Sequence, residues 1–313
     1  MLNLVVDSIH DETDRIRVFT LCEASGAELP GYLPGAHLDF DLGELGTRSY
    51  SLIDWKSSLS TRNYTIAVQR EDDGTGGSKA MHRLEAGRAI KVLPPENDFE
   101  LRDGAAPVLL LAGGIGVTPL ISMASALDAQ ARDFAFHYSA RSAGVMGFRE
   151  RLGQAFPDHM VFHFDDQAPL DLAKLMSAQP PDTQLYICGP KGMIDAAREA
   201  AITAGLAEAN IHIELFSAPE AQSGDASFEV EIHDTGEVFV IPAGKTIIEV
   251  LEEAGKDLMY DCQRGDCGIC QTDVISGTPD HRDVVLSEAD RAAGKVMQIC
   301  VSRAKSGRLV LDL

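Results

Sequence analysis

The sequence is short of basic residues. Among 313 residues, 27 are Lys or Arg and 48 are Asp or Glu, so the formal net charge is −21. This balance argues against nonspecific nucleic-acid binding, which requires a surplus of Lys and Arg facing phosphates, and it disfavours docking on an anionic membrane surface. Hydrophobic residues make up 45% and charged residues 24%, as is typical of a folded globular protein.

Signals for export and membrane insertion are also missing. Residues 1–13 lack the basic end and the apolar core of a secretory signal. Residues 104–127 carry no charge and are long enough to span a bilayer, but glycines and Pro119 interrupt them. A strand, a glycine turn and a helix are the better interpretation of this segment. We therefore expect a cytoplasmic protein with neither a membrane nor a nucleic acid as partner.

Three patterns of apolar residues follow one another and predict a multidomain chain. Residues 1–103 contain short alternating runs separated by Gly and Pro, which predicts an antiparallel β-barrel with one helix at Ser78–Glu85. Residues 104–217 alternate between strands and helices, which predicts a doubly wound parallel α/β sheet. The expected strands are 108–112, 134–138, 160–164, 184–188 and 211–216, and the expected helices are 118–127, 145–155, 170–176 and 193–204.

The remainder of the chain changes pattern again. Residues 218–226 are small and polar and are expected to form a linker. Residues 227–313 return to strand alternation at 228–232 and 237–241, followed by a helix at 247–253 and a strand at 295–299. This predicts a third domain.

Four of the six cysteines lie in the last fifth of the chain. Cys262, Cys267 and Cys270 are followed after 29 residues by Cys300, which is the spacing of plant-type [2Fe–2S] ferredoxins. Two irons need four thiolates, and the glycines between the first three let backbone N–H groups approach the sulfurs. A structural zinc ion on the same thiolates is the alternative, although such sites more often use two closely spaced cysteine pairs. We expect the cluster.

A glycine-rich loop follows the strand at 108–112. It runs through Gly113, Gly114, Ile115, Gly116, Val117, Thr118 and Pro119 into a helix. The loop lacks the G-x-G-x-x-G dinucleotide pattern. Its bare backbone N–H groups and the helix start can nevertheless hold a pyrophosphate, and tight packing without a ligand is the alternative.

A second candidate site combines a strand and a turn in the first domain. Arg48, Ser49, Tyr50 and Ser51 offer a cation for a phosphate, an aromatic face and a hydroxyl, which are the groups that a flavin needs. Alone, such a tetrapeptide is an ordinary strand sequence. Gly76, Gly77 and Ser78 open the expected helix, so its first N–H groups face an anion.

Together these motifs resemble the phthalate dioxygenase reductase family, which includes the vanillate demethylase reductases and lies in the ferredoxin–NADP reductase superfamily. The resemblance covers nearly the whole chain. It is carried by the Arg-x-Tyr-Ser run at 48–51, the glycine loop at 113–119, the turn Cys188-Gly189-Pro190, and residues 228–313, which look like a plant-type ferredoxin of the α+β β-grasp fold. It implies the order flavin domain, nicotinamide domain, cluster domain.

The resemblance also implies cofactors and site residues. It implies FMN rather than FAD, for which we find no adenine platform, with its phosphate on the turn at Gly76–Ser78 and Ala67, Val68 and Gln69 flanking the ring. Phe216 lies near the flavin in relatives, and core packing is its alternative. Ser51 and Cys188 are expected to be catalytic, with Cys188, Gly189 and Pro190 beside the nicotinamide. Tyr138, Ser139 and Arg141 end the second strand, at the adenosine ribose. The relatives use NADH, although Arg141 leaves NADPH open.

The expected function is a reductase component that passes electrons from NADH through FMN and a [2Fe–2S] cluster to a Rieske-type oxygenase. The oxygenase is expected to be a transient partner of a monomeric reductase. Two alternatives stay open: the same domains serving another acceptor such as a cytochrome P450, and a non-enzymatic iron–sulfur redox sensor. The sensor would need a DNA-binding or signalling segment, and none is evident in the sequence.

Overall fold

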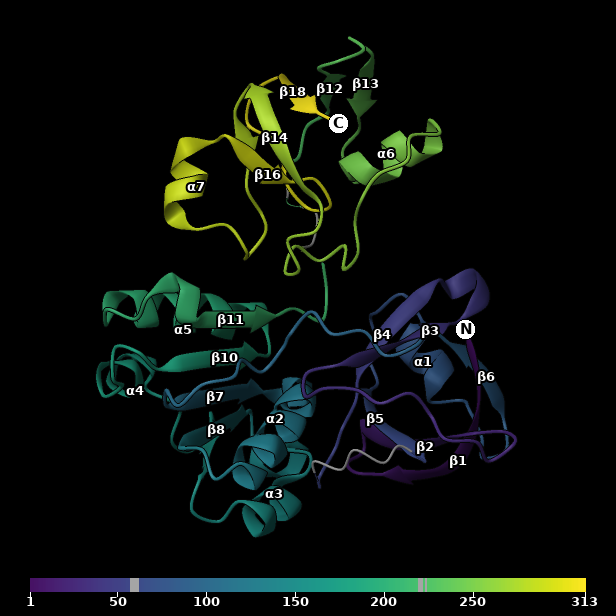
Figure 1. Cartoon of the computed structure of the whole chain (residues 1–313), viewed down its shortest axis with the longest axis vertical. Coiled ribbons are helices and arrows are strands. Elements are labelled where there is room, and N and C mark those ends of the chain that lie inside the picture. Colours follow the sequence, from purple (N-terminus) through teal and green to yellow (C-terminus); the bar gives the residue numbers. More distant parts are fainter. Residues whose placement is uncertain (57–61, 219–221, 223) are drawn as a thin grey trace. The chain divides into compact units, whose positions relative to one another are not determined.

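The computed structural model describes residues 1–56, 62–218, 222 and 224–313 (Figure 1). The chain divides into two compact units, Met1–Glu214 and Leu215–Leu313, here called the N-terminal and the C-terminal unit. The N-terminal unit contains two sheets. The predicted division of this unit at residue 103 remains a prediction, as does the linker at 218–226, where 219–221 and 223 lie outside the described residues.

The first sheet of the N-terminal unit is six-stranded and antiparallel, with the order β4-β3-β6-β1-β2-β5. Its strands are β1 (Leu2–Asp11), β2 (Ile16–Glu23), β3 (His37–Asp41), β4 (Thr47–Ser51), β5 (Asn63–Gln69) and β6 (Ala89–Val92). A bridge between Leu52 and Ile66 joins the chain after β4 to β5, so the sheet curls towards closure. The predicted barrel is confirmed as a curled half-barrel, with alternating side chains such as Leu38 and Tyr64 filling its core.

The helix of the half-barrel is shorter than predicted. A short 3₁₀ turn, η1 (Gly43–Leu45), precedes β4, and the helix α1 covers only Gly77–Met81 instead of Ser78–Glu85. Beyond Met81 the hydrogen bonds tighten, because the Arg83 and Leu84 N–H groups bond to carbonyls three residues back. The helix therefore ends in a turn before Gly87, whose φ is 85°.

The second sheet is five-stranded and parallel, with the order β11-β10-β7-β8-β9. Its strands are β7 (Val108–Gly113), β8 (Phe134–Ala140), β9 (Met160–Phe164), β10 (Gln184–Cys188) and β11 (Ile211–Glu214). The helices α2 (Val117–Ala129), α3 (Arg149–Ala155), α4 (Leu172–Ser177) and α5 (Lys191–Thr203) alternate with them, together with short turns η2 (Gly114–Gly116), η3 (Ala143–Val145) and η4 (Glu208–Asn210). All six residues of the central strand β7 are buried, as expected for a strand covered on both faces.

The elements β7, β8, α2, α4 and α5 differ from their predicted bounds by one or two residues, and two other differences have a clear structural cause. Helix α3 begins at Arg149 rather than Val145, because the preceding Phe148 adopts a left-handed φ of 60° that no helix can include. Strand β11 ends at Glu214 rather than Phe216. The next N–H group, that of Leu215, bonds to the Asp266 carboxylate at 2.7 Å and so leaves the strand ladder.

The half-barrel and the parallel sheet share one hydrophobic core within the N-terminal unit. Ile16, Val18 and Ile53 of the first pack with helix α2 and strand β8 of the second. Ser122 on α2 also links them, because its hydroxyl donates to the Leu52 carbonyl at 2.7 Å and accepts the Asp54 N–H at 2.8 Å. The half-barrel and the parallel sheet are therefore joined by both apolar packing and hydrogen bonds.

The C-terminal unit is a mixed five-stranded sheet packed against a helix. Its order is β13-β12-β18-β14-β16, with β12 (Phe228–Ile232) parallel to β18 (Arg308–Asp312), and with β13 (Val238–Ile241), β14 (Gln271–Ser276) and β16 (Val296–Gln298) pairing antiparallel. A small ribbon pairs β15 (Pro279–Asp280) with β17 (Arg303–Ala304). Helix α6 (Ile247–Glu253) has the capping box that Thr246 and Glu249 encode. Helix α7 (Glu288–Ala293), short and polar, was not predicted.

Within the described residues, none of the helices has the length and apolar character needed to cross a bilayer.

Candidate functional sites

The predicted flavin residues on β4 meet the predicted phosphate turn. The Arg48 guanidinium donates to the Thr75 hydroxyl at 2.7 Å, just before that turn. A Cβ added to Gly77 would lie 2.7 Å from Arg48 Nε, so only glycine lets this side chain lie against the start of α1. Gly76 has a φ of 100°, which also favours glycine. The fold therefore brings a cation and the free N–H groups of a helix start to one place.

Among the predicted flavin residues, Ser51 combines a buried side chain with an unpaired hydroxyl. It is 4% exposed, and its hydroxyl has no hydrogen-bond partner among the described residues. Leaving a buried hydroxyl unpaired costs about 1–3 kcal/mol, so a bound group that satisfies it is favoured. A flavin ring placed against this hydroxyl fits that requirement.

The neighbouring residues divide between the core and the surface. Tyr50 packs edge-on against Phe40, and burial raises the pKa of its hydroxyl to about 12. Ala67 and Val68 are buried, so their side chains belong to the core. Gln69 donates to Glu71 at 2.6 Å. The other two predicted serines already have hydrogen-bond partners. Ser49 donates to Asp39 at 2.5 Å, and the Ser78 hydroxyl accepts the Glu71 N–H at 3.0 Å.

The two predicted nicotinamide loops approach each other at the ends of the neighbouring strands β7 and β10. A Cβ on Gly116 would lie 2.3 Å from the Cys188 carbonyl oxygen, and one on Gly113 would lie 2.7 Å from Pro190 Cδ. A Cβ on Gly189 would lie 2.9 Å from Gly113 Cα. These glycines are needed for close backbone approach, and the Met193 side chain packs against Gly113 and Gly189.

The remaining loop residues form the first turn of α2. Val117, Thr118 and Pro119 are buried, Ile115 is half-buried, and Gly114 has a φ of 55°. The Thr118 hydroxyl donates to the Ile115 carbonyl at 3.0 Å. Any contact of this turn with a pyrophosphate would therefore come from the backbone N–H groups that a helix start leaves unpaired.

Cys188 lies beside a carboxyl group that sequence reasoning missed. Its thiol is fully buried and 3.9 Å from Glu214 Oε2, which is itself in a side chain only 5% exposed. Parallel pairing of β10 with β11 places the two residues side by side. In the sequence, this carboxyl group is indicated by the position of Glu214 near the end of the predicted strand at 211–216.

At the end of β8, the structure adds two acidic residues to the predicted ribose site. Asp165 and Asp166 donate their N–H groups to the carbonyls of Ala140 and Arg141, at 3.1 and 3.3 Å. Ser139 is half-buried and Arg141 exposed, whereas Tyr138 is fully buried, so its ring belongs to the core rather than to a ligand site. The signal for the acidic pair was its position directly after a predicted strand.

The four predicted cluster ligands converge in the C-terminal unit. The Cys262 thiol is in hydrogen-bonding contact with Cys267 and with Cys300, and Cys300 with Cys270. None of the four forms a disulfide. The Arg264 N–H points to the Cys262 sulfur at 3.3 Å, which is the kind of backbone contact that stabilises thiolate charge. Four thiols with an N–H donor fit an iron–sulfur cluster.

Buried polar groups support the loop that carries the first three cysteines. Gly265 has a φ of 86°, and a Cβ there would lie 3.0 Å from Asp283 Cα. The Val284 N–H bonds to the Gly265 carbonyl at 2.9 Å. Burial raises the pKa of Asp266 in this loop to about 7, although the neighbouring Arg264 lowers it.

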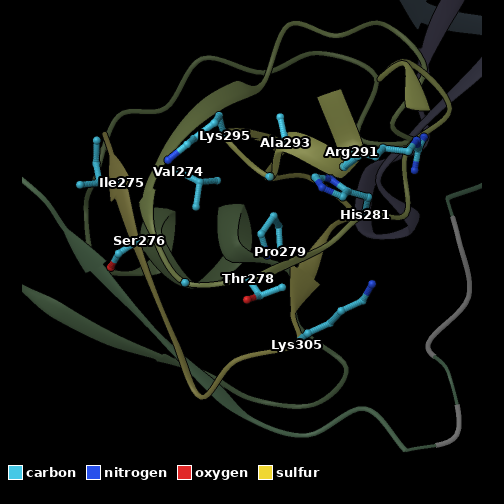
Figure 2. Close-up of a pocket in the computed structure, with 13 residues that line it drawn as sticks. Val274, Ile275, Ser276, Thr278, Pro279, His281, Arg291, Ala293, Lys295 and Lys305 are labelled. Carbon is cyan, nitrogen blue, oxygen red and sulfur yellow. The ribbon is translucent and has the colours of Figure 1, made fainter. Parts of the chain in front are cut away.

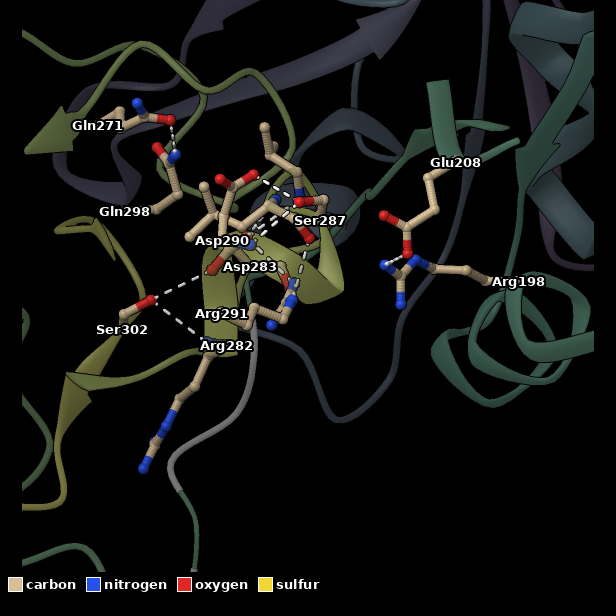
Figure 3. A network of polar contacts seen from close by, with 12 residues as sticks. Arg198, Glu208, Gln271, Arg282, Asp283, Ser287, Asp290, Arg291, Gln298 and Ser302 are labelled. Carbon is tan, nitrogen blue, oxygen red and sulfur yellow. Dashed lines mark hydrogen bonds and ion pairs between the residues drawn. The ribbon is translucent and has the colours of Figure 1, made fainter. Parts of the chain in front are cut away.

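A fully buried carboxylate, Asp283, organises the segment that covers this loop (Figure 3). It accepts the Leu286 N–H at 2.8 Å and the Arg291 guanidinium at 3.1 Å, and it lies 3.5 Å from the Ser302 hydroxyl. Because Val284 follows directly, this network fixes the contact between the segment and the cysteine loop.

Two further observations concern residues outside these sites. Phe216, predicted near the flavin or in the core, is the second residue of the C-terminal unit and is 45% exposed, so it is not a core residue. The sequence shows no histidine ligand spacing, yet among the described residues the ligand atoms of His37, Asp39 and Glu96 lie within 4.8 Å of one another. The Ser49 hydroxyl already donates to Asp39 there.

The chain is similar to several known proteins. Residues 230–305 match the 2Fe-2S iron-sulfur cluster binding domain. The whole chain is 40% identical to the vanillate O-demethylase oxidoreductase of Pseudomonas sp. (strain HR199 / DSM 7063), and the alignment covers all of both chains. It is also similar to the solved structure of phthalate dioxygenase reductase, described as a modular structure for electron transfer from pyridine nucleotides to [2Fe-2S], with 34% identity, a TM-score of 0.73, and coverage of 100% of this chain and 98% of that one.

A third similarity is to a longer protein. An intact type IV self-sufficient cytochrome P450 monooxygenase matches the whole of this chain with 34% identity and a TM-score of 0.78. The match covers 41% of the P450 chain, so this chain spans less than half of that protein's length.

Proposed function

The chain belongs to the phthalate dioxygenase reductase family, and from that premise we propose that it carries electrons from NADH through FMN and a [2Fe–2S] cluster to a terminal oxygenase. The observation that carries this proposal is the convergence of four cysteine thiols in the C-terminal unit. In the N-terminal unit, two glycine loops lie close together and the predicted flavin strand meets the predicted phosphate turn. We assign the three roles to residues 1–103, 104–217 and 227–313.

The half-barrel supplies a fitting flavin site. FMN, when bound, supplies the conversion of a two-electron hydride into single electrons. Arg48 and the N–H groups at the start of α1 would hold its phosphate, and the unpartnered Ser51 hydroxyl would hydrogen-bond to its ring. The hydroxyl and the phosphate cradle would hold the two ends of the flavin on the half-barrel, which shares its core with the parallel sheet.

The parallel sheet supplies a fitting nicotinamide site. At Gly114 nothing lies within 4 Å of an added Cβ, so a pyrophosphate would meet bare backbone at this point of the loop. Cys188 and Glu214 are buried, so water is excluded from both side chains. The Cys188 thiol, 3.9 Å from the Glu214 carboxyl, can hold a proton there. Asp165 and Asp166 beside Arg141 support NADH, since a carboxylate accepts the ribose 2′-hydroxyl and repels a 2′-phosphate.

Cys262, Cys267, Cys270 and Cys300 would hold the cluster, which would supply single electrons to an acceptor of higher potential. Plant-type clusters lie near about −400 mV and Rieske centres between about −150 and +300 mV. The two potentials differ by at least ~250 mV. Because ~59 mV corresponds to a tenfold change for one electron, the equilibrium constant for transfer to the Rieske centre exceeds about 10⁴. A Rieske-type oxygenase is therefore the proposed acceptor, met briefly by a monomeric reductase. Free thiols throughout the chain support residence in the reducing cytoplasm.

A second acceptor is supported by one observation. The match to a self-sufficient P450 monooxygenase covers this entire chain, so the same domains also occur within a protein of that name. NADH-dependent reduction of a purified Rieske oxygenase, compared with that of a purified P450, separates the two acceptors. Faster reduction of the P450 would overturn the Rieske assignment and leave the reductase assignment intact.

The reductase itself is tested with artificial acceptors. Cys270→Ser should abolish NADH–cytochrome c reduction and retain most ferricyanide reduction, because the flavin alone can serve ferricyanide. Cys22→Ser, which changes a half-buried thiol outside the cluster group, is the matched control and should keep both activities. Equal loss of both activities in Cys270→Ser would show that the cluster is structural. Absence of any NADH oxidation by the wild-type holoprotein would refute the reductase function.

A further inference from the structure

The cysteine loop, residues 262–270, has two hydrogen-bonded supports. In the first, the Val284 N–H bonds to the Gly265 carbonyl at 2.9 Å, within the segment that the buried Asp283 organises. Arg291, which donates to Asp283, belongs to the wall of a pocket of about 340 Å³ that is formed by β14, the turn into β15 and the end of α7 (Figure 2). The first support therefore comes from the segment that follows the loop in the chain.

The second support is Asp266, which lies inside the loop and directly precedes Cys267. Its Oδ2 atom accepts the Leu215 N–H at 2.7 Å, and its side chain is only 4% exposed. The same carboxyl group is in hydrogen-bonding contact with the Cys262 thiol, and the Arg264 guanidinium lies 3.6 Å away. Asp266 therefore joins the part of the loop that carries two cluster ligands to Leu215.

Leu215 is the residue at which the chain enters the C-terminal unit. Glu214, the last residue of the N-terminal unit, precedes it directly and has its carboxyl group 3.9 Å from the Cys188 thiol. Because Leu215 is 6% exposed, its N–H depends on an acceptor within the protein, and Asp266 supplies that acceptor. This hydrogen bond makes the connection between Glu214 and the cysteine loop as short as the chain allows.

The next fixed point along the chain is Asp225, ten residues after Leu215. The Arg282 guanidinium donates to both of its carboxylate oxygens, at 2.5 and 3.0 Å. Among the described residues between the two points, 216–218, 222 and 224, the hydrogen bonds are those that join Gln222 to Asp225. If Leu215 were released, the connection would lengthen by up to these ten residues, which span about 33–36 Å when fully extended.

We propose that Asp266 is a positioning residue for electron transfer to the cluster, because it holds Leu215 at the cysteine loop and so keeps the tether between the cluster ligands and Glu214 at its shortest. The step concerned moves one electron at a time from the reduced flavin to the oxidised cluster, and no bond forms or breaks. A longer tether lowers the effective concentration of one partner at the other, so the rate of this step should depend on the anchor. A neutral and an ionised carboxyl group both offer an oxygen to the N–H, so the role does not depend on titration. The inference rests on the proposed function.

Two pairs of variants test the anchor from its two ends. Asp266→Leu removes the acceptor, whereas Asp266→Asn keeps a side-chain oxygen at a similar position. Leu215→Pro removes the donor without changing the cysteine loop, and Glu214, as a strand residue, is compatible with a following proline. Leu215→Ala keeps the N–H and is the control for the lost side chain. Asp257→Leu removes an exposed carboxylate of the same unit and is the control for the lost charge.

The rates are measured by stopped flow on the full-length holoprotein, in which NADH first reduces the flavin and the cluster is reduced in a second phase. We expect Asp266→Leu and Leu215→Pro to slow the second phase about tenfold or more, as a longer tether requires. Asp266→Asn, Leu215→Ala and Asp257→Leu should stay within a few-fold of the wild type. The reduction potential of the cluster is measured in each variant, so that a changed driving force is separated from a changed position.

Hydrogen–deuterium exchange provides a readout that does not depend on activity. The Leu215 N–H should exchange about tenfold or more faster in Asp266→Leu than in the wild type or Asp266→Asn, because it has lost its acceptor. Unchanged exchange at Leu215 would overturn the proposal, and so would a wild-type rate of cluster reduction in both Asp266→Leu and Leu215→Pro.

Two further outcomes are decisive. A loss of rate that the change in potential explains in full, or an equal loss in Asp266→Leu and Asp266→Asn, would also overturn the positioning role. If Asp266→Leu assembles no cluster, the comparison of Leu215→Pro with Leu215→Ala decides, because neither changes the cysteine loop. Failure of the wild type to reduce its flavin with NADH would instead refute the proposed function.

Discussion

Replacing Gly116 by alanine should separate the two loops that approach each other at the ends of β7 and β10. The added Cβ would lie 2.3 Å from the Cys188 carbonyl oxygen and 2.7 Å from the Gly189 nitrogen. Ordinary contact begins at 3.4 Å, so the Cys188 backbone must retreat by 3.4 − 2.3 = 1.1 Å. The φ of Gly116 is −61°, which alanine adopts freely, so the whole effect is steric.

The size of the effect follows from this displacement. Forcing one extra carbon into packed surroundings costs about 1–3 kcal/mol of folding free energy. A shift of about 1 Å in a positioning residue can reduce the rate about 100-fold. Because Cys188 would face the nicotinamide, we expect Gly116→Ala to lower kcat/KM for NADH by about two orders of magnitude, measured with ferricyanide so that the cluster is not involved.

Gly205→Ala is the matched control, in the N-terminal unit but outside the glycine loop. Its φ of 93° costs an alanine about 1–2 kcal/mol of strain, yet nothing lies within 4 Å of the added Cβ. It should therefore destabilise the fold by a similar amount and leave kcat/KM within a few-fold of the wild type. Equal kinetic losses in the two variants, or a wild-type kcat/KM in Gly116→Ala, would refute the reasoning that backbone approach at Cys188 forms the nicotinamide site.

Three other substitutions test the remaining contacts. Arg48→Gln should weaken FMN retention by about tenfold or more, because it removes a charge-assisted contact with the phosphate; unchanged release of flavin fluorescence on dilution would contradict that role. Asp225→Asn should lower the free energy of unfolding at pH 7 by roughly 2 kcal/mol, since the Arg282 guanidinium holds the pKa of Asp225 down at about 2. A depressed carboxyl pKa stabilises the fold above pH ~4, and this stabilisation is lost as the pH falls towards 2. Urea melts followed by the cluster absorbance should therefore converge for the wild type and the variant over that range. Coincident melts at pH 7 would contradict the stabilising role of Asp225. Glu214→Gln should slow flavin reduction by NADH about tenfold or more and change its pH profile, because it neutralises the carboxyl beside Cys188; stopped-flow rates equal to the wild type at every pH would exclude that contribution.

The elements that the sequence predicted well are those whose bounds depend on residues close together in the sequence. Strands β9, β10 and β12 have the predicted bounds because each is a short apolar or alternating run. Helix α6 begins and ends as predicted, since Thr246 and Glu249 form a capping box. The bounds of α3 were wrong because they depend on the left-handed backbone of Phe148, which no apolar periodicity encodes.

The candidate sites divide in the same way. The glycine loop, the Arg-x-Tyr-Ser strand and the cysteines were visible because each is contiguous or regularly spaced. Glu214 and the pair Asp165 and Asp166 were not, because only parallel strand pairing brings them to Cys188 and Arg141. Contacts of this kind depend on strand order, which a single sequence does not state.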